Sequence, residues 1–234
     1  MDSTALVTGA SLGIGRATAI ALGRAGYRVG LCARNPGRVE AVVAELRKDG
    51  IEAVGVPADV GHPDQVSRAL ERITGELGPI DVLVNNAGVM IARPFEELTL
   101  EEWDATMATN LRSLFLVTRA VLPGMRLRRR GAIVNVASLA GRNGFAGGTA
   151  YSASKHAVLG FSRSLMLEVR KEGVRVITIC PGSVDTALRR DQPMLEVEPE
   201  RILLPEDVAD TIVNALSLPE RALVSELDLR PTNP

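Results

Sequence analysis

The chain has 234 residues, 46% of them hydrophobic and 24% charged, a globular composition at a length that suits one α/β domain as well as two smaller ones. The formal net charge of −1 gives no overall field that would attract nucleic acid or an anionic membrane surface. No apolar run approaches the roughly 20 residues that span a bilayer, and the N-terminus enters a strand pattern without a charged leader. We therefore expect a cytoplasmic protein with a small-molecule partner, and neither nucleic acid nor membrane.

Short β-branched runs alternate along the chain with longer stretches of helical period. The expected strands are residues 5–8, 28–33, 51–57, 80–85, 132–137, 174–180 and 225–229. Between them, apolar residues recur at intervals of three and four, as in 39–50 and 156–173. Near-continuous apolar strands joined by helices predict a parallel sheet covered on both faces. No linker or repeat divides the chain, so we expect a single domain over 1–234, a Rossmann-type doubly wound sheet of about seven strands.

The first expected strand ends in the sequence TGASLGIG (residues 8–15) and runs directly into a helical pattern. Glycines at positions 9, 13 and 15 allow a tight turn, close approach of the backbone to a pyrophosphate, and close packing of the helix on the strand. The helix N-terminus then faces the anion. Ordinary turn chemistry is the alternative, but the place of this segment between a strand and a helix favours a dinucleotide site.

Each of the first six expected strands is followed at once by small or polar residues. These are Gly9 to Gly15, Ala33 and Arg34, Asp59 and Val60, Asn86 to Gly88, Ser138, and Pro181 and Gly182. Ligands of open α/β sheets bind at the carboxyl ends of the strands. The six marked strand ends therefore predict a long cofactor cleft along one edge of the sheet.

Tyr151 and Lys155 are four residues apart at the start of a helical stretch, which places both side chains on one face. A lysine ammonium there favours the phenolate and lowers the tyrosine pKa from about 10 toward the operating pH, as general acid-base catalysis requires. The alternative is an exposed pair worth a few tenths of a kcal/mol. Ser138 upstream and the glycine turn argue for the catalytic interpretation.

The cysteines and histidines predict no further chemistry. Cys32 and Cys180 lie in or at the end of strand-like runs and are expected to be buried and unpaired. His62 and His156 have no cysteine or acidic partners at ligand spacing, so no metal site is expected. The basic run 126–130 is expected to solvate a helix end.

From residue 5 to about 186, these motifs have the order and spacing that resemble the short-chain dehydrogenase/reductases, in their compact single-domain branch. The resemblance implies that Tyr151 donates a proton to a substrate carbonyl oxygen, that Ser138 hydrogen-bonds this oxygen, and that Lys155 biases Tyr151 and holds a ribose. Asn110 would position a water molecule in the proton relay. Its alternative role is to stabilise a kink or turn within a helix.

The resemblance also implies a nicotinamide cofactor. Its expected binding residues are Gly9, Ser11, Gly13, Ile14, Gly15, Arg34, Asp59, Val60, Asn86, Ala87, Gly88, Tyr151, Lys155, Pro181, Gly182, Val184 and Thr186. Ala33 offers no carboxylate to a ribose hydroxyl, and Arg34 is placed to meet a 2′-phosphate, so NADP(H) is expected to be favoured over NAD(H). Leu12 stands where NADP-using relatives often carry a second basic residue in the glycine turn.

The predicted function is interconversion of a small carbonyl compound and its secondary alcohol by an NADP-preferring enzyme. The alternatives are a nucleotide-sensing regulator on the same fold and an extended-branch enzyme acting on nucleotide sugars. The chain ending resembles a subgroup acting on small hydroxy acids more than the acyl carrier-protein reductases, and residues 187–204 are expected to cover the substrate. Arg93, Arg142 and Arg189 are candidates for a substrate carboxylate or plain surface residues.

We also expect a homo-oligomer, a tetramer in preference to a dimer. The expected helices 101–125 and 152–172 carry apolar faces with which relatives pair, beyond what one sheet face can bury.

Overall fold

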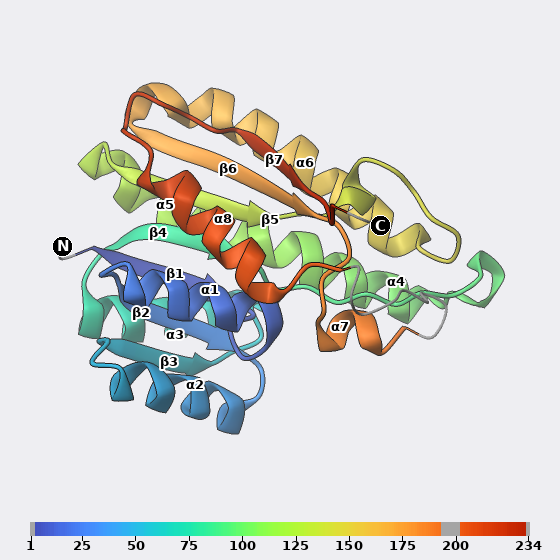
Figure 1. The fold of residues 1–234 in the computed structure, drawn as a ribbon, viewed down its shortest axis with the longest axis horizontal. Coiled ribbons are helices and arrows are strands. Elements are labelled where there is room, and N and C mark those ends of the chain that lie inside the picture. The colour runs from blue at the N-terminus through green and yellow to red at the C-terminus, as the bar shows by residue number, and fades with distance from the viewer. Residues whose placement is uncertain (1–2, 193–201, 233–234) are drawn as a thin grey trace.

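The structure is a computed structural model that describes residues 3–192 and 202–232. Seven parallel strands form one sheet in the order β3-β2-β1-β4-β5-β6-β7 (Figure 1). The strands are β1 (Thr4–Thr8), β2 (Arg28–Ala33), β3 (Ala53–Pro57), β4 (Ile80–Asn85), β5 (Gly131–Val136), β6 (Val174–Pro181) and β7 (Glu226–Leu229). All seven expected strands are confirmed, with their ends shifted by at most two residues. The direction of strand addition reverses between β1 and β4, which is where ligands bind in such sheets.

Helices connect consecutive strands. They are α1 (Gly13–Arg24), α2 (Pro36–Lys48), α3 (Pro63–Leu77), α4 (Leu100–Met107), α5 (Ser113–Arg128), α6 (Thr149–Val169), α7 (Ala187–Arg190) and α8 (Pro205–Ser217), with 3-10 turns η1 (Phe95–Glu97), η3 (Leu139–Gly141) and η4 (Arg170–Glu172). Several helix starts follow from sequence. Asn35 caps α2 through the amide of Arg38, and Thr99 forms a capping box with Glu102 at α4.

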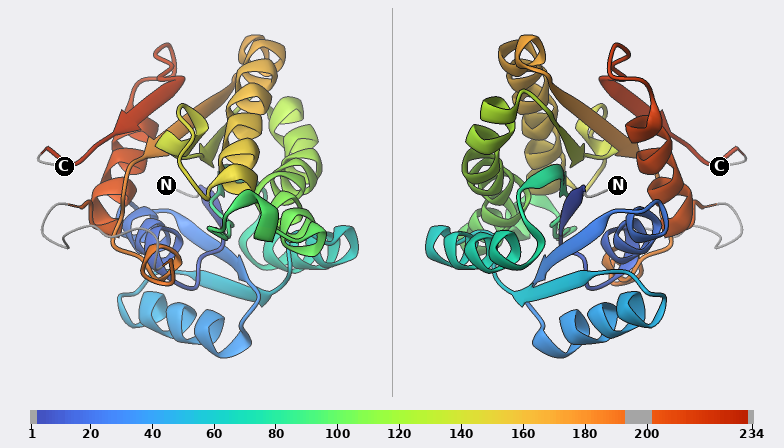
Figure 2. Two further views of the ribbon diagram at one scale, coloured as in Figure 1. Left: turned by 90° about the vertical axis from the view of Figure 1, so that its right-hand side faces the viewer. Right: turned by 90° about the vertical axis from the view of Figure 1, so that its left-hand side faces the viewer.

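The sheet lies between two layers of helices, as Figure 2 shows from both ends. Alternate residues of each strand point to opposite faces, so Ala5 and Val7 pack with α1, α2 and α8, whereas Leu6 packs with α3, α5 and α6. Both faces of the central strands are buried. The near-continuous apolar runs in the sequence are therefore explained, and the predicted doubly wound architecture is confirmed.

A π-helical turn, η2 (Ala108–Arg112), interrupts the helix expected over residues 101–125. It separates α4 from α5 and holds Asn110 in its middle. Single π turns inside helices occur often at functional sites. The apolar periodicity of the segment did not reveal it, because the helical hydrogen bonding continues on both sides.

A buried ladder of polar side chains crosses β4, β5 and α6. Asn85 and Asn135 are paired in register on adjacent strands, and Asn85 Nδ2 donates to Asn135 Oδ1 at 2.9 Å and to Thr118 Oγ1 at 3.0 Å. Asn135 Nδ2 donates onward to Ser162 Oγ at 2.9 Å. Buried polar groups are retained where they are hydrogen-bonded, so this ladder fixes α6 against the two strands.

Of the segment 187–204 that was expected to cover the substrate, residues 193–201 lie outside the described part of the chain. Residues 187–190 form α7, and Gln192 Nε2 donates to the carbonyl of Met90 at 3.0 Å while its Oε1 accepts from the amide of Ala92 at 2.9 Å. The end of α7 is thereby joined to the loop that follows β4. Among the helices described, none has the length and apolarity needed to cross a membrane.

Candidate active site

The glycine turn after β1 is built so that backbone, not side chain, faces the carboxyl edge of the sheet. Gly9 and Gly13 have φ of +65° and +52°, which glycine adopts without strain. A Cβ on Gly15 would lie 2.3 Å from the carbonyl oxygen of Gly9, so α1 packs against the turn with no room for a side chain. Leu12 supplies no side-chain cap to α1. The first amides of the helix thus suit an anion such as a pyrophosphate.

Asn86 braces this turn from the neighbouring strand. Its Nδ2 donates to the carbonyl oxygens of Thr8 at 3.1 Å and Gly9 at 3.2 Å. The hydroxyl of Thr8 accepts the amides of Asn86 and Ala87, both at 3.1 Å. The sequence predicted a cofactor-binding residue at Asn86, and the structure adds that its side chain links the loops after β1 and β4.

A cleft of about 630 Å³ runs along the carboxyl edge of the sheet. It is lined by most of the predicted site residues, namely Gly9, Ser11, Gly13, Ile14, Arg34, Asp59, Val60, Asn86, Ala87, Gly88, Ser138, Tyr151, Lys155, Pro181, Gly182, Val184 and Thr186. Gly15 and Asn110 are the two predicted residues that do not line it. The marked strand ends are therefore brought together in one cleft, as expected from a parallel sheet.

Ser138, Tyr151 and Lys155 lie together in the wall of this cleft. Ser138 follows β5, and its Oγ accepts the amide of Ala140 at 3.1 Å. Lys155 Nζ donates to the carbonyl of Val136 at 2.8 Å and lies 5.7 Å from the centre of the Tyr151 ring. The ring of Phe145 meets the Tyr151 ring edge-on, with centres 6.4 Å apart.

Burial dominates the electrostatics of this group. It raises the pKa of Tyr151, and a hydrogen bond with Ser138 acts in the opposite direction. Burial also lowers the pKa of Lys155 to about 8. The expectation that Lys155 lowers the tyrosine pKa is wrong for the chain by itself: the ammonium is directed at the Val136 carbonyl, and desolvation of the buried phenol dominates its pKa.

Asn110 lies behind the cleft wall. Its Oδ1 accepts the amide of Val89 at 2.7 Å, and its Nδ2 donates to the carbonyl of Val89 and to Ser154 Oγ, both at 2.9 Å. A Cβ on Gly88 would lie 3.5 Å from Asn110 Oδ1 and 3.8 Å from Lys155 Nζ. Asn110 therefore lies near the lysine, and its side chain connects the π turn with the β4 loop and α6.

Two basic residues line the β2 end of the cleft. Arg34 was predicted there, and Arg38 was not. Arg38 lies in the first turn of α2, four residues after Arg34, and a helix start at Pro36 was the signal that could have placed both at the same end. Arg38 thus adds a second positive charge at this end of the cleft.

The three arginines considered as partners of a substrate carboxylate differ in their position relative to the cleft. Arg93 pairs with Glu102 at 2.7 Å, and Arg142 pairs with Glu226 and Asp228 outside the cleft. Only Arg189 lines the cleft. Sequence reasoning missed several apolar and polar wall residues, Met90, Leu139, Asn143, Phe145 and Leu188, because no motif marks a wall contributed by loops.

Comparisons with known proteins agree with this geometry. The chain matches the family model of the short chain dehydrogenases over residues 3–194. It is 48% identical over 186 residues to a putative ketoacyl reductase of the monensin polyketide synthase from Streptomyces virginiae, covering 79% of this chain and 71% of that one. It is 39% identical to a 3-oxoacyl-[acyl-carrier-protein] reductase from Synechocystis sp., covering 89% and 86%.

Among solved structures, a metagenomic short-chain oxidoreductase in complex with NADP superposes with a TM-score of 0.87 at 38% identity, covering 99% of this chain and 97% of that one. Neither of the two ketoacyl or oxoacyl reductases above is named for small hydroxy acids, the subgroup that the chain ending resembled. The fold, the cleft and these matches together lead to one conclusion: the chain belongs to the short-chain dehydrogenase family.

Proposed function

We propose that the protein is an NADP-preferring reductase that interconverts a small carbonyl compound and its secondary alcohol, with Tyr151 as the general acid-base. One observation carries the proposal: Ser138, Tyr151 and Lys155 lie together in the wall of a cleft that ends at the glycine turn, with Tyr151 hydrogen-bonded to Ser138. The first relatives are named as reductases of ketoacyl groups, which agrees with carbonyl chemistry.

The proton step is assigned to side chains of this protein. The Tyr151 hydroxyl donates a proton to the substrate carbonyl oxygen, and Ser138 hydrogen-bonds the same oxygen. NADPH, when bound, supplies the hydride. Burial raises the pKa of Tyr151, so the side chain retains the proton that it donates to the carbonyl oxygen. Lys155 binds the nicotinamide ribose, and its ammonium, 5.7 Å from the centre of the Tyr151 ring, stabilises the phenolate that proton donation leaves, although burial dominates the resting pKa of Tyr151. Asn110 positions a water molecule in the relay beside Lys155.

The residues present fit the dinucleotide. The glycine turn leaves backbone amides where a pyrophosphate needs donors, and the absent Cβ of Gly15 permits the close packing of α1 on the turn. Asp59 and Val60 would meet the adenine, and the loop from Pro181 through Val184 to Thr186 would meet the nicotinamide end. Arg34 and Arg38 would hold a 2′-phosphate.

Tyr151→Phe tests the catalytic assignment. It keeps the ring and removes the only group assigned to deliver the proton, so turnover should fall by about 10²–10⁴-fold while the melting temperature and cofactor affinity stay unchanged. Tyr27→Phe, which removes the only other phenol in the chain, should leave turnover unchanged. If the Tyr151 variant kept more than about a tenth of turnover on a ketone panel that includes a β-ketoacyl thioester, the assignment would be wrong and a nucleotide-sensing role would replace it.

The cofactor preference is tested by titrating NADPH and NADH by fluorescence. NADPH should bind more tightly, and Arg34→Ala should weaken NADPH far more than NADH. Arg38→Ala should do the same to a smaller extent, whereas Arg68→Ala on α3 should change neither affinity. Equal affinities for the two dinucleotides in the unchanged protein would contradict the preference.

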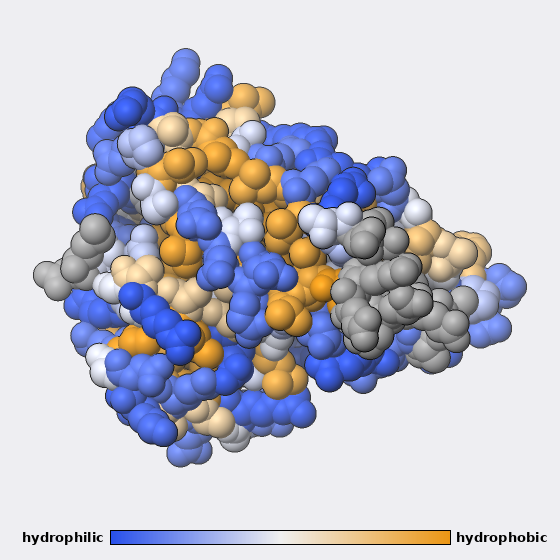
Figure 3. All heavy atoms as spheres, in the orientation of Figure 1, coloured by the Kyte–Doolittle hydropathy of each residue, from blue (hydrophilic) through white to orange (hydrophobic). Residues whose placement is uncertain are grey.

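We further infer one domain acting in the cytoplasm as a homo-oligomer, with a tetramer expected. Phe115 on α5 and Leu167 on α6 are 44% and 58% exposed, and the guanidinium of Arg119 covers the Phe115 ring at 6.0 Å. Figure 3 also shows apolar side chains gathered over α8 and the β7 edge. Such faces mark interaction surfaces. A monomer in sedimentation at micromolar concentration would contradict the oligomer.

A further inference from the structure

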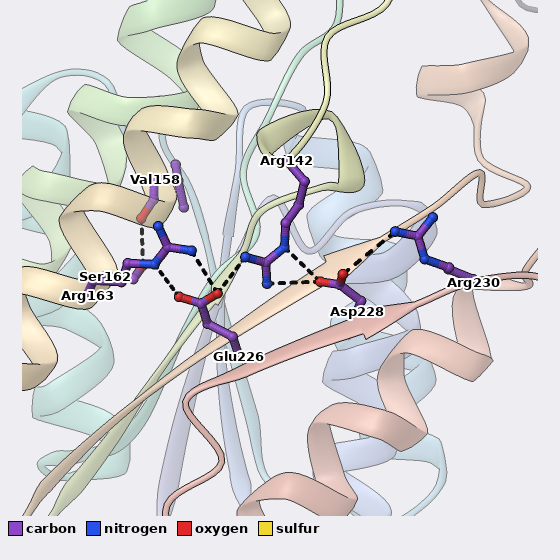
Figure 4. Close-up of polar contacts among 7 residues, drawn as sticks. All are labelled: Arg142, Val158, Ser162, Arg163, Glu226, Asp228 and Arg230. Atoms are coloured by element: carbon purple, nitrogen blue, oxygen red, sulfur yellow. Dashed lines mark hydrogen bonds and ion pairs between the residues drawn. The ribbon is translucent and has the colours of Figure 1, made fainter.

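An ion network lies where η3, α6 and β7 meet, with the guanidinium of Arg142 between two carboxylates of β7 (Figure 4). Arg142 Nη1 is 2.7 Å from Glu226 Oε2, and both its Nε and its Nη2 are 3.0 Å from Asp228 Oδ1. Arg163 of α6 holds the other side of Glu226 at 2.6 Å, and Arg230 lies 3.7 Å from Asp228. Arg142 is thus the one member that contacts both carboxylates.

The strand geometry sets the spacing of the two carboxylates. Glu226 and Asp228 are two residues apart on β7, so both point to one face of the sheet, while Leu227 and Leu229 pack into the core on the other. β7 pairs with β6 so that Asp228 lies beside Cys180, one residue before Pro181. The amide of Gly182 also donates to the carbonyl of Leu229 at 2.8 Å. β7 therefore anchors the loop after β6 as well as the guanidinium.

Arg142 ends a single tight turn that begins at Ser138. Its amide donates to the carbonyl of Leu139 at 2.9 Å, and the amide of Gly141 donates to the carbonyl of Ser138 at 2.9 Å. Gly141 packs directly on α6, because a Cβ there would lie 2.7 Å from the carbonyl oxygen of Lys155. A movement of Arg142 must therefore move the turn relative to α6, and with it the Ser138 hydroxyl.

The centre of this network is partly shielded from water, since Arg142 is 26% exposed and Glu226 is 20% exposed. Arg163 and Arg230 at its rim are 55% and 59% exposed. Two carboxylates in contact with one planar guanidinium fix its orientation as well as its position, which a single flexible exposed pair does not do. The network therefore holds the turn in place more firmly than a single surface ion pair would.

We propose that Arg142 is a positioning residue for Ser138, and that the carboxylate pair of β7 sets the placement of the Ser138 hydroxyl at the reacting oxygen. The proposal rests on the proposed function, since it gives Ser138 its role there. Arg142 touches neither substrate nor cofactor in this assignment; it acts through the turn.

The test is a double-mutant cycle of Arg142→Met and Ser138→Ala, read in kcat, KM and melting temperature with NADPH and the best ketone of the panel. Arg142→Met should lower kcat by about tenfold, because a hydrogen bond made in the transition state is misplaced, and should change KM little. In the Ser138→Ala background it should lower kcat by less than about twofold, because the hydroxyl it positions is gone.

Matched variants separate positioning from stability. Arg163→Met removes the outer contact to Glu226 and should leave kcat within about twofold, even if the melting temperature falls as it does for Arg142→Met. Arg142→Lys, which can contact one carboxylate, should retain an intermediate kcat. If Arg142→Met does not fold, Asp228→Asn takes its place in the cycle, with the same direction and a smaller loss.

If the kcat losses of the two single variants multiply in the double variant, the positioning role is wrong. It is also wrong if Arg142→Met leaves kcat unchanged. Failure of the proposed function has a different signature, because Ser138→Ala and Tyr151→Phe would then both leave kcat unchanged. A tenfold loss in Arg142→Met under that condition would mean that Arg142 acts on some other group, which also overturns the proposal.

Discussion

On the β1 to β3 side of the switch point the cleft is built on a glycine turn that depends on close backbone packing, whereas on the β4 to β6 side it depends on side chains held by polar contacts. Gly9 and Gly13 bring backbone to the first wall, and Gly15 lets α1 pack against the turn behind them, so all three depend on the absence of a side chain. Ser138, Tyr151 and Lys155 form the second, over the buried ladder from Asn85 to Ser162. One half suits recognition of a shape common to dinucleotides, and the other suits placement of a few atoms for chemistry.

This contrast predicts that adding a side-chain atom on the glycine side of the cleft disrupts dinucleotide binding and the fold. Gly15→Ala places a Cβ against the Gly9 carbonyl and Asn86 Nδ2, so the turn must move away from α1. We expect dinucleotide affinity to fall by about 100-fold or more and the free energy of unfolding to fall by about 3 kcal/mol. Fluorescence titration and denaturant unfolding measure the two effects.

Gly75→Ala is the matched control, because nothing lies within 4 Å of the Cβ added on the exposed side of α3. It should leave dinucleotide affinity unchanged and raise the unfolding free energy by about 0.5–1 kcal/mol. A Gly15→Ala protein that binds like the control would show that the close packing is not needed.

On the β4 to β6 side, removing a polar group from the buried ladder should destabilise the fold. Asn135→Leu keeps the side-chain size but removes two buried hydrogen bonds, the one from Asn85 and the one to Ser162, while the bonds from Asn85 to Thr118 and from Ser162 to Val158 remain. The unfolding free energy should fall by about 2–3 kcal/mol, since two buried hydrogen bonds are lost where no water replaces them. Denaturant unfolding of Asn135→Leu beside Asn214→Leu, an exposed position on α8, checks this. Equal stability of the two variants would contradict the role of the ladder.

The smallest expected effect concerns Lys155, whose buried ammonium is needed for the proposed chemistry but destabilises the folded protein. Burial lowers its pKa to about 8 from an ordinary 10.5, so below pH 8 the folded protein must hold a desolvated ammonium. This cost, about 3 kcal/mol, disappears as the pH rises from 8 to 10.5, because the unfolded chain then binds the proton that the folded chain has lost. Lys155→Met should therefore raise the unfolding free energy of the cofactor-free protein at pH 7, by about 2 kcal/mol after loss of the bond to Val136.

At pH 10.5 that gain should vanish, and Lys171→Met, at an exposed lysine, should show neither effect. Thermal unfolding at the two pH values distinguishes the outcomes. A destabilised Lys155→Met at pH 7 would mean that the lysine is held by contacts stronger than its burial cost.

The two halves also differ in how far the sequence predicts them. The strand ends and the glycine turn follow from apolar runs and residue spacing, since backbone conformation is set locally. The π turn around Asn110, the raised pKa of Tyr151 and the partners of Arg142 do not, because each depends on groups brought near by the fold. Arg38 is an intermediate case. The local sequence predicts its place in the first turn of a helix, but only the fold brings it to the cleft.

The strand order has a consequence for synthesis of the protein. Strands β1 to β4 are complete at Asn85, whereas β7 is complete only at Leu229, on the order of ten seconds later at about 5–20 residues per second. The helix α1 packs against α8, so its apolar residues Ala19 and Leu22 lack their cover until residues 205–217 have left the ribosome. During that interval the nascent chain presents a finished nucleotide turn beside an uncovered apolar face, the kind of surface that chaperones bind and that aggregates form from.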